Sequence, residues 1–467
     1  MPAWICFLWV TFAYQTGEVA HSTEGARQAP IQTVVVGSCA RQDRPAPVWD
    51  AMHLAKPDAV ILLGDNIYGD TRDPEVLRSK YQKLVDNPSF KRLRQGRPLM
   101  ATWDDHDYGE NDAGEEYPFK DQSKKFFLEF LGEGGADPRA GRPGIQQSWI
   151  MGPPGKRVQF ILLDTRWNRT PLAKKEGRKG EYAPLDDPKA TFLGDEQWDW
   201  LEKELAKEAE IRLIGSSIQV ISEEHPFEKW ANFPRERERF LSLLQKTNAN
   251  GVVLLSGDRH LGEISCLSSR SGAVGYPLFE LTASGINQGS PKFRVVEPNR
   301  HRVAAMPWGN HFGVVRMDWA KPDPEVRLEL RDETGDVVVS SRFSLSNLQR
   351  KGPSLPPTVL KDGEIDPAGV ASRLGQSVRL RFRVASTGKA KDQSRVFLNT
   401  HEDFRDKDNV TIVLDMRALG GALAEKGIKD PVSAYAGKEL VAVGKIELFR
   451  ESPQIVILSL DNLIAEK

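Results

Sequence analysis

Short apolar runs that end abruptly in polar residues recur along the first two thirds of the chain. The runs are residues 31–36, 60–63, 100–102, 158–163, 211–221 and 252–255. Their length and their content of valine, isoleucine and leucine are typical of strands that are buried on both faces of a parallel sheet. Stretches with apolar residues at helical spacing lie between them, for example at 47–56 and 120–131. This alternation predicts an α/β domain.

From about residue 366 the pattern changes to short strands separated by turn residues, with one short helix at 419–426. The strands are expected at 378–384, 396–398, 410–414, 439–443 and 455–458. This spacing predicts a small all-β domain. The segments 397–399, 435–438 and 441–445 weakly resemble an OB-fold module, and OB folds often bind oligonucleotides or sugars.

A Pro- and Gly-rich stretch at 352–357 separates the two patterns. We therefore expect an α/β domain at 28–347, a linker at 348–365 and an OB-like domain at 366–467. The last domain carries nearly equal numbers of basic and acidic residues, which gives little attraction for a phosphate backbone. A structural or protein-interaction role is favoured for it, and nucleic-acid binding is possible but not favoured.

The overall composition is that of a soluble globular protein. The chain has 467 residues, of which 39% are hydrophobic and 28% charged, and its formal net charge is −1. Such a balance creates no field that attracts nucleic acid or an anionic membrane. The three cysteines, at positions 6, 39 and 266, do not indicate a disulfide framework. Function must therefore come from local sites.

The first 20 residues differ from the rest of the chain. The apolar run at 4–14 is too short to span a bilayer, and small residues precede a plausible cleavage point near Ala20. We expect residues 1–20 to be a signal peptide and the protein to be exported, to the periplasm or the cell exterior, with no membrane span after cleavage. An uncleaved anchor and a misassigned start are the alternatives.

Residues that can bind metal ions follow four of the apolar runs directly. Carboxylates and phenols suit hard cations, and a thiolate binds iron or zinc. Each motif alone is compatible with a structural role, such as a small buried thiol or a solvated acidic loop. Open α/β sheets bind their ligands at the carboxyl ends of the parallel strands. We therefore expect the four motifs to meet at one sheet edge. The candidate metal ligands are Cys39, Asp65, Tyr68, Asp104, Asp105, Asp258 and His260.

The four motifs GSC, GDxxY, DDHD and GDxH, in this order, resemble the alkaline phosphatase D (PhoD-like) branch of the calcineurin-like metallophosphoesterase superfamily. The resemblance covers residues 34–347 and includes the segments LDTRWNR, LGDEQWDWL and EKWANFPRERERFL. It implies a four-layer α/β/β/α metallophosphoesterase sandwich. Cys39 and Asp258 stand where the superfamily at large has the motifs Asp-x-His and Gly-His-x-His, a pattern that looks like this branch.

The resemblance also implies which metals these residues bind. Asp65 would bridge two metal subsites, and Cys39, Tyr68 and Asp258 would complete a site for Fe³⁺.

Asp105 and His260 would help to hold Ca²⁺ or another divalent ion, with Asp104 and Asn111 as second choices. Gln219 lies where it might replace the histidine that the superfamily usually has in its middle motif.

These expectations define an exported, metal-dependent hydrolase of phosphomonoesters, phosphodiesters or both, acting on small or polymeric esters. A metal-bound hydroxide would attack phosphorus, since a metal lowers the pKa of bound water. His106 is the candidate to donate a proton to the leaving oxygen, and Arg166 is a candidate phosphate contact. Two alternatives are a nuclease-like phosphodiesterase that grips a polymer with its OB-like domain and a non-catalytic binding protein on the same fold.

Overall fold

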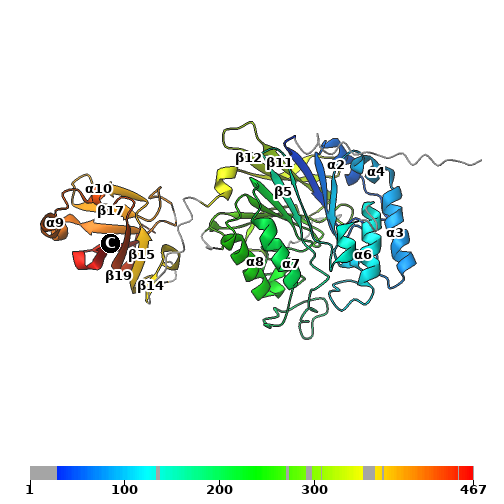
Figure 1. Ribbon diagram of the computed structural model, residues 1–467, viewed down its shortest axis with the longest axis horizontal. Coiled ribbons are helices and arrows are strands. Elements are labelled where there is room, and N and C mark those ends of the chain that lie inside the picture. Colours follow the sequence, from blue (N-terminus) through cyan, green and yellow to red (C-terminus); the bar gives the residue numbers. More distant parts are fainter. Residues whose placement is uncertain are drawn as a thin grey trace, which may run out of the picture.

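Two β-sheets lie face to face in the N-terminal part of the chain (Figure 1). The computed structural model describes residues 29–465, apart from 133–136, 270–272, 291–296, 307, 351–362, 371–372, 407 and 451. The signal peptide predicted at 1–20 lies outside the described residues, as does most of the predicted linker.

The first sheet has six strands in the order β13-β12-β11-β1-β2-β3. Its parallel half consists of β1 (Thr33–Gly37), β2 (Ala59–Leu63) and β3 (Leu99–Thr102). Its antiparallel half consists of β11 (His311–Asp318), β12 (Glu325–Asp332) and β13 (Val337–Ser344).

The second sheet has seven strands in the order β10-β8-β9-β7-β6-β5-β4. Four of them run parallel: β5 (Val158–Leu162), β6 (Ile211–Gly215), β7 (Val252–Ser256) and β9 (Leu278–Ala283). The antiparallel members are β4 (Gln147–Met151), β8 (Gly262–Leu267) and β10 (Arg302–Met306).

Helices cover the outer face of each sheet (Figure 1). Beside the first sheet lie α2 (Val48–Leu54), α3 (Pro74–Asp86), α4 (Pro88–Arg94) and α6 (Lys120–Leu131). Beside the second lie α7 (Asp195–Leu205) and α8 (Pro234–Lys246). Local sequence sets some boundaries: α3 begins at Pro74 because the Asp73 side chain accepts a hydrogen bond from the backbone of Glu75 at 2.9 Å.

Side chains of β1 alternate between two apolar cores. Val34 and Val36 pack in the core between the sheets, which also contains Leu254 of β7. Val35 points the other way and packs in the core that contains Trp49 of α2. This alternation follows from the two-residue period of a strand, and it places one apolar layer on each face of the sheet. The predicted four-layer α/β/β/α sandwich is confirmed.

The prediction that all four motifs lie at one sheet edge is wrong. Strands β1, β2 and β3 carry three of the motifs on the first sheet, whereas β7 carries the fourth on the second. The strand expected at 211–221 also ends early, at Gly215. Apolar runs show where buried strands lie, but they do not show which strands pair. The motifs therefore meet across two packed sheets.

The C-terminal domain contains a third sheet, in the order β14-β15-β19-β20-β18-β17-β16, with β21 paired to β19. Its strands are β14 (Glu364–Ile365), β15 (Ser377–Arg383), β16 (Ser386–Lys389), β17 (Arg395–Asn399), β18 (Thr411–Asp415), β19 (Glu439–Phe449), β20 (Ser452–Ile457) and β21 (Leu463–Ala465). Two helices, α9 (Met416–Glu425) and α10 (Pro431–Tyr435), accompany the sheet. More strands form than expected, because short strands such as β14 carry too few apolar residues to be recognised from the sequence.

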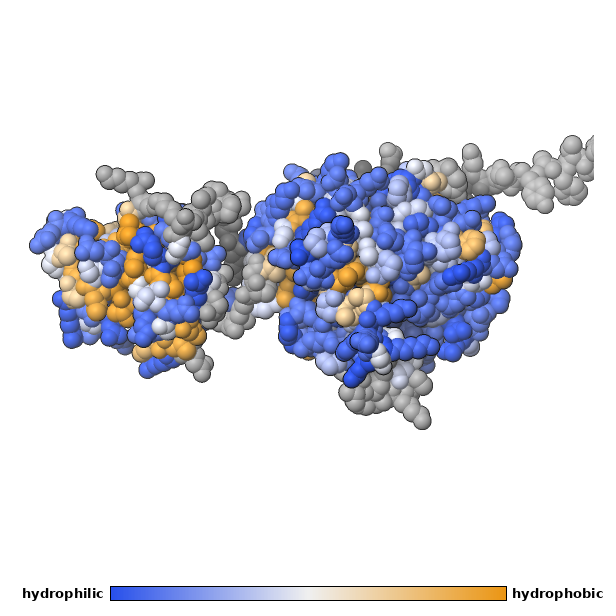
Figure 2. All heavy atoms as spheres, turned by 90° about the horizontal axis from the view of Figure 1, so that it is seen from below, coloured by the Kyte–Doolittle hydropathy of each residue, from blue (hydrophilic) through white to orange (hydrophobic). Residues whose placement is uncertain are grey.

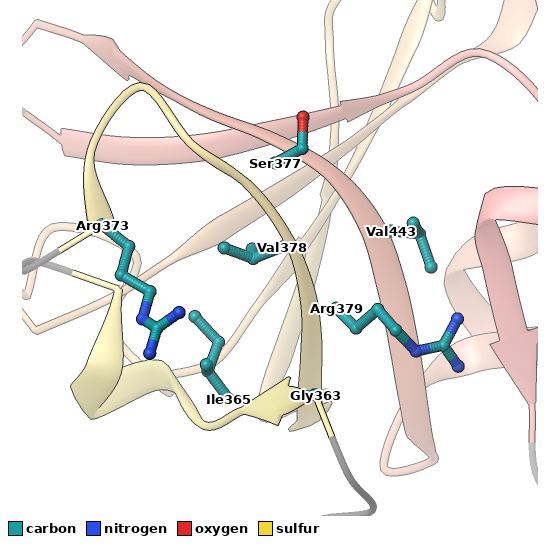
Figure 3. Close-up of a pocket in the computed structure, with 7 residues that line it drawn as sticks. All are labelled: Gly363, Ile365, Arg373, Ser377, Val378, Arg379 and Val443. Carbon is teal, nitrogen blue, oxygen red and sulfur yellow. The ribbon is translucent and has the colours of Figure 1, made fainter.

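The surface of this domain is partly apolar. Figure 2 shows apolar residues gathered on its visible face, and Leu448, Phe449 and Leu458 are more than half exposed. A cavity of about 200 Å³ is lined by Ile365, Val378 and two arginines, among others (Figure 3). No predicted site residue lines this cavity. None of the helices in the described part of the chain is both long and apolar enough to cross a membrane.

Candidate metal centre

The motif residues adopt backbone conformations that side chains normally avoid. Cys39, Asp65, Asp258 and His260 have positive φ angles of 61°, 49°, 65° and 52°. Such left-handed residues cost about 1–3 kcal/mol each, and they cluster at functional sites where the surrounding structure holds them in place. The turns after β1, β2 and β7 are therefore sharply bent, and this bending directs the side chains toward one another.

Gly64 lets the second and third motifs approach closely. Its φ is +91°, and a Cβ atom at this position would lie 2.6 Å from the backbone nitrogen of Asp104. Only glycine accommodates this contact without a shift of the neighbouring chain. The carboxylates that follow β2 and β3 are brought together as a result.

Seven candidate residues form three overlapping groups whose possible ligand atoms lie within 4.8 Å of one another. The groups are Cys39 with Asp65 and His260, Asp65 with Asp105 and His106, and Asp104 with Asp105 and Asp258. Asp65 and Asp105 each belong to two groups, so a chain of shared carboxylates links the three. This arrangement is suited to more than one cation.

The thiol of Cys39 is fully buried among polar atoms. Its sulfur lies 3.3 Å from Asp65 Oδ2 and 3.1 Å from Ser284 Oγ. Burial raises the pKa of the Cys39 thiol to about 12, so the thiolate needs a nearby cation to form. Tyr68 completes this side of the site, because its hydroxyl lies 2.8 Å from His260 Nε2.

Buried carboxylate oxygens are the clearest indication that these residues suit a cation. Asp65 Oδ1, Asp104 Oδ2 and Asp105 Oδ1 are buried and have no hydrogen-bond partner among the described residues. Burial raises the pKa of Asp65 well above its usual range, and the charges of Cys39 and Asp105 raise it further. Burying several anionic oxygens without partners is unfavourable. Bound metal ions would satisfy these oxygens, so the residues fit a metal centre.

Arg166 is buried between two carboxylates. Its Nε donates to Asp104 Oδ1 at 2.6 Å, and its guanidinium lies 2.8 Å from Glu228 Oε2. Arg169 pairs with the other oxygen of Glu228 at 3.1 Å. These contacts form a buried chain of ion pairs that begins at the candidate ligand Asp104 and continues through Arg166 and Glu228 to Arg169. The predicted contact of Arg166 with phosphate stays a prediction.

His106 lies at the partly exposed side of the centre, on the short helix α5 (Asp105–Tyr108). Its ring centroid is 4.2 Å from that of Tyr68, and its Nδ1 lies 2.6 Å from Asp70 Oδ1. Burial lowers the pKa of His106, but the carboxylates of Asp105 and Asp70 outweigh this effect and raise it to about 9. The ring is therefore oriented by Asp70, and Nε2 is left for another partner.

Asn111, a second choice as a ligand, and Gln219, the expected replacement for the usual histidine, both have other partners. Asn111 Nδ2 donates to Asp112 Oδ2 at 2.6 Å. Gln219 donates to Glu263 Oε1 at 3.1 Å, within a polar network between the strands of the second sheet.

Comparison with known proteins assigns the chain to a family. A model of the family described as PhoD-like phosphatase matches residues 34–328. The chain belongs to this family. Alkaline phosphatase D of Bacillus subtilis (strain 168) is 27% identical over 247 residues, which cover 44% of this chain and 42% of that protein. The chain thus aligns with less than half of that relative's length.

A solved structure described as that of PhoD has the same fold. It superposes with a TM-score of 0.55 at 18% identity, and the match covers 72% of this chain and 74% of that chain. The predicted membership of the PhoD-like branch is confirmed.

The sequence did not predict the roles of four residues that shape the site of this PhoD-like phosphatase family member. They are Asp70, Asp112, Tyr182 and Glu228. Asp70 orients His106, and Glu228 holds Arg166. Asp112 donates its backbone N–H to Asp105 Oδ2 at 2.6 Å and accepts a hydrogen bond from the Tyr182 hydroxyl at 2.5 Å. Asp70 and Asp112 have φ angles of 43° and 56°, but a sequence does not display such strain. Only the segment EKW, which contains Glu228, was part of the recognised pattern.

Proposed function

We propose that the protein is a metal-dependent hydrolase of phosphate esters. One observation supports this proposal above all. Three linked groups of potential ligands, with buried carboxylate oxygens that have no hydrogen-bond partner among the described residues, lie in a domain of the PhoD-like phosphatase family. Asp65 would contribute to more than one metal subsite, because it belongs, like Asp105, to two of the groups.

The donor set suggests which metals would bind. Cys39 and Tyr68 offer sulfur and oxygen donors suited to Fe³⁺, while the carboxylates of Asp104, Asp105 and Asp258, which form one of the groups, suit Ca²⁺ or another hard divalent ion. When bound, such ions supply Lewis-acid polarisation of a phosphoryl group and activation of water. The protein supplies a rigid, largely buried set of ligands and, on its partly exposed side, His106.

The substrate is proposed to be a small or polymeric phosphate ester. Export is proposed as well, and it rests only on the apolar run at 4–14 that predicts a signal peptide.

The purified full-length protein is expected to contain iron and calcium and to hydrolyse p-nitrophenyl phosphate, bis-p-nitrophenyl phosphate or both. Chelation should abolish turnover, because buried carboxylates without metal ions repel a phosphoryl group instead of binding it. Returning the metals should restore turnover. Elemental analysis and initial-rate assays before and after chelation check this expectation. Turnover that survives complete metal removal would contradict the proposal, as would absence of turnover in the fully loaded protein.

Replacing His106 by alanine is expected to lower kcat by about 100-fold, the usual contribution of a positioned proton donor. Because Asp70 engages Nδ1, the proton would pass from Nε2 to the leaving oxygen. Metal content should remain that of the wild type. The control is His53→Ala, since His53 lies at the end of α2 and belongs to none of the ligand groups. Unchanged kcat would remove this role from His106, and loss of metal would identify the residue as a ligand instead.

A further inference from the structure

The loop that follows β1 is fixed to a distant part of the chain. The side chain of Asn287 accepts a hydrogen bond from the backbone nitrogen of Arg41 at 2.7 Å and donates to its carbonyl at 2.8 Å. The same amide donates to the carbonyl of Arg44 at 3.3 Å. Two of these hydrogen bonds hold the backbone of Arg41, two residues after Cys39, and the third holds the backbone of Arg44.

The guanidinium of Arg41 lies beside the metal ligands. Its Cζ is 5.4 Å from the ring centroid of Tyr68, a distance typical of a cation–π contact. The Tyr68 ring also contacts His106, and its hydroxyl reaches His260. Arg41 is half-buried, so its donors lie at the border between the centre and solvent.

The charge of Arg41 is uncommitted, unlike that of the other arginines near the site. Arg166 and Arg169 both pair with the buried Glu228, and Arg259 pairs with Glu297 at 3.0 Å. Within the described part of the chain no ion pair joins Arg41 to a carboxylate. Asp43, an acid of the same loop, pairs instead with Lys83 at 2.7 Å. The charge of Arg41 helps to lower the pKa of Asp43, after Lys83, but forms no ion pair with it among the described residues, so the half-buried guanidinium is available to a ligand of negative charge.

We propose that Arg41 contacts the phosphoryl group of the substrate. Its planar fork of donors matches two oxygens of a phosphate, and the Tyr68 ring supports it from one side. Asn287 acts as a positioning residue that holds this loop. The inference rests on the proposed function and adds to it the residue that recognises the phosphate. Arg41 is half-buried, whereas Arg166 is fully buried and its donors are already engaged.

The test measures binding of inorganic phosphate to the metal-loaded full chain by calorimetry, together with p-nitrophenyl phosphate kinetics. Arg41→Ala is expected to weaken phosphate binding by about 10- to 100-fold, the range for a charged hydrogen bond, and to raise KM by a similar factor. Arg41→Lys should lose less, since it keeps the charge but not the fork. Metal content and unfolding temperature should match the wild type in both variants.

Arg44→Ala is the matched control, because Arg44 is exposed on the same loop and its guanidinium donates to Gln288 at 2.7 Å. It should change phosphate binding by less than about threefold, as expected for an exposed charge. Unchanged phosphate binding by Arg41→Ala, in a wild type that hydrolyses esters, would overturn this inference and leave the proposed function standing. An equal loss in both variants would also overturn it, since the effect would then be that of general loop charge. A loaded wild type that neither binds phosphate nor hydrolyses esters would overturn both.

Discussion

Replacing Asp65 by asparagine is expected to remove most of the bound metal and to lower turnover by on the order of 1,000-fold, equivalent to about 4 kcal/mol. Asp65 belongs to two of the three ligand groups, so one change disturbs both proposed subsites. Asparagine has nearly the same shape and tolerates the left-handed backbone that Asp65 adopts, so the turn itself should persist. Elemental analysis and kinetics on the purified variant measure the effect.

Stability separates metal loss from misfolding in this variant. In the metal-free protein burial raises the pKa of the Asp65 carboxylate, and the charges of Cys39 and Asp105 raise it further. A neutral amide relieves that repulsion, so metal-free Asp65→Asn should unfold at a temperature no lower than metal-free wild type. Adding metal should stabilise only the wild type, since binding to the native state shifts the unfolding equilibrium.

Asp73→Asn is the control for this exchange. Asp73 is the exposed cap of α3, where asparagine serves equally well. It should keep metal, activity and stability. Full metal content and full turnover in Asp65→Asn would exclude the bridging role.

Replacing Arg166 by alanine is expected to lower the free energy of unfolding by about 3–5 kcal/mol, the cost of breaking a buried ion pair from one side. The change leaves Asp104 and Glu228 buried without their common cation. Burial already raises the pKa of Glu228 even though Arg166 and Arg169 lower it. Chemical denaturation of chelated wild type and variant measures the difference without a contribution from metal loss.

An exposed ion pair supplies the comparison. Arg72 pairs with Glu110, and the two side chains are 62% and 40% exposed. Arg72→Ala should therefore cost no more than about 1 kcal/mol. If Arg166→Ala costs as little as this control, the buried network does not stabilise the domain, and the predicted phosphate contact becomes the better explanation for Arg166.

Local features of the site could be predicted from the sequence because they depend on neighbouring residues. An apolar run followed by Gly-Asp marks both the strand and the ligand at its end, as at Gly64-Asp65 and Gly257-Asp258. Glu228 and Asn287 could not be assigned in this way. Their roles depend on partners far along the chain, such as Arg166 and Arg41, and on burial that an isolated polar residue does not reveal.

The pairing of strands within the sheets could not be predicted for the same reason. Residues 311–344 contribute the antiparallel half of the first sheet. They follow the last strand of the second sheet along the chain, yet they pair with β1 near its beginning. Strand patterns record which segments are buried, whereas the choice of neighbour is made by tertiary packing.

The contact between Cys39 and Ser284 spans 245 positions, and that between Arg41 and Asn287 spans 246. Closing such long loops is slow, so the thiol side of the centre is completed only after both sheets have formed and met. We therefore expect the proposed metal ions to bind to a domain that is already folded. Their binding should then slow unfolding and leave the rate of folding unchanged.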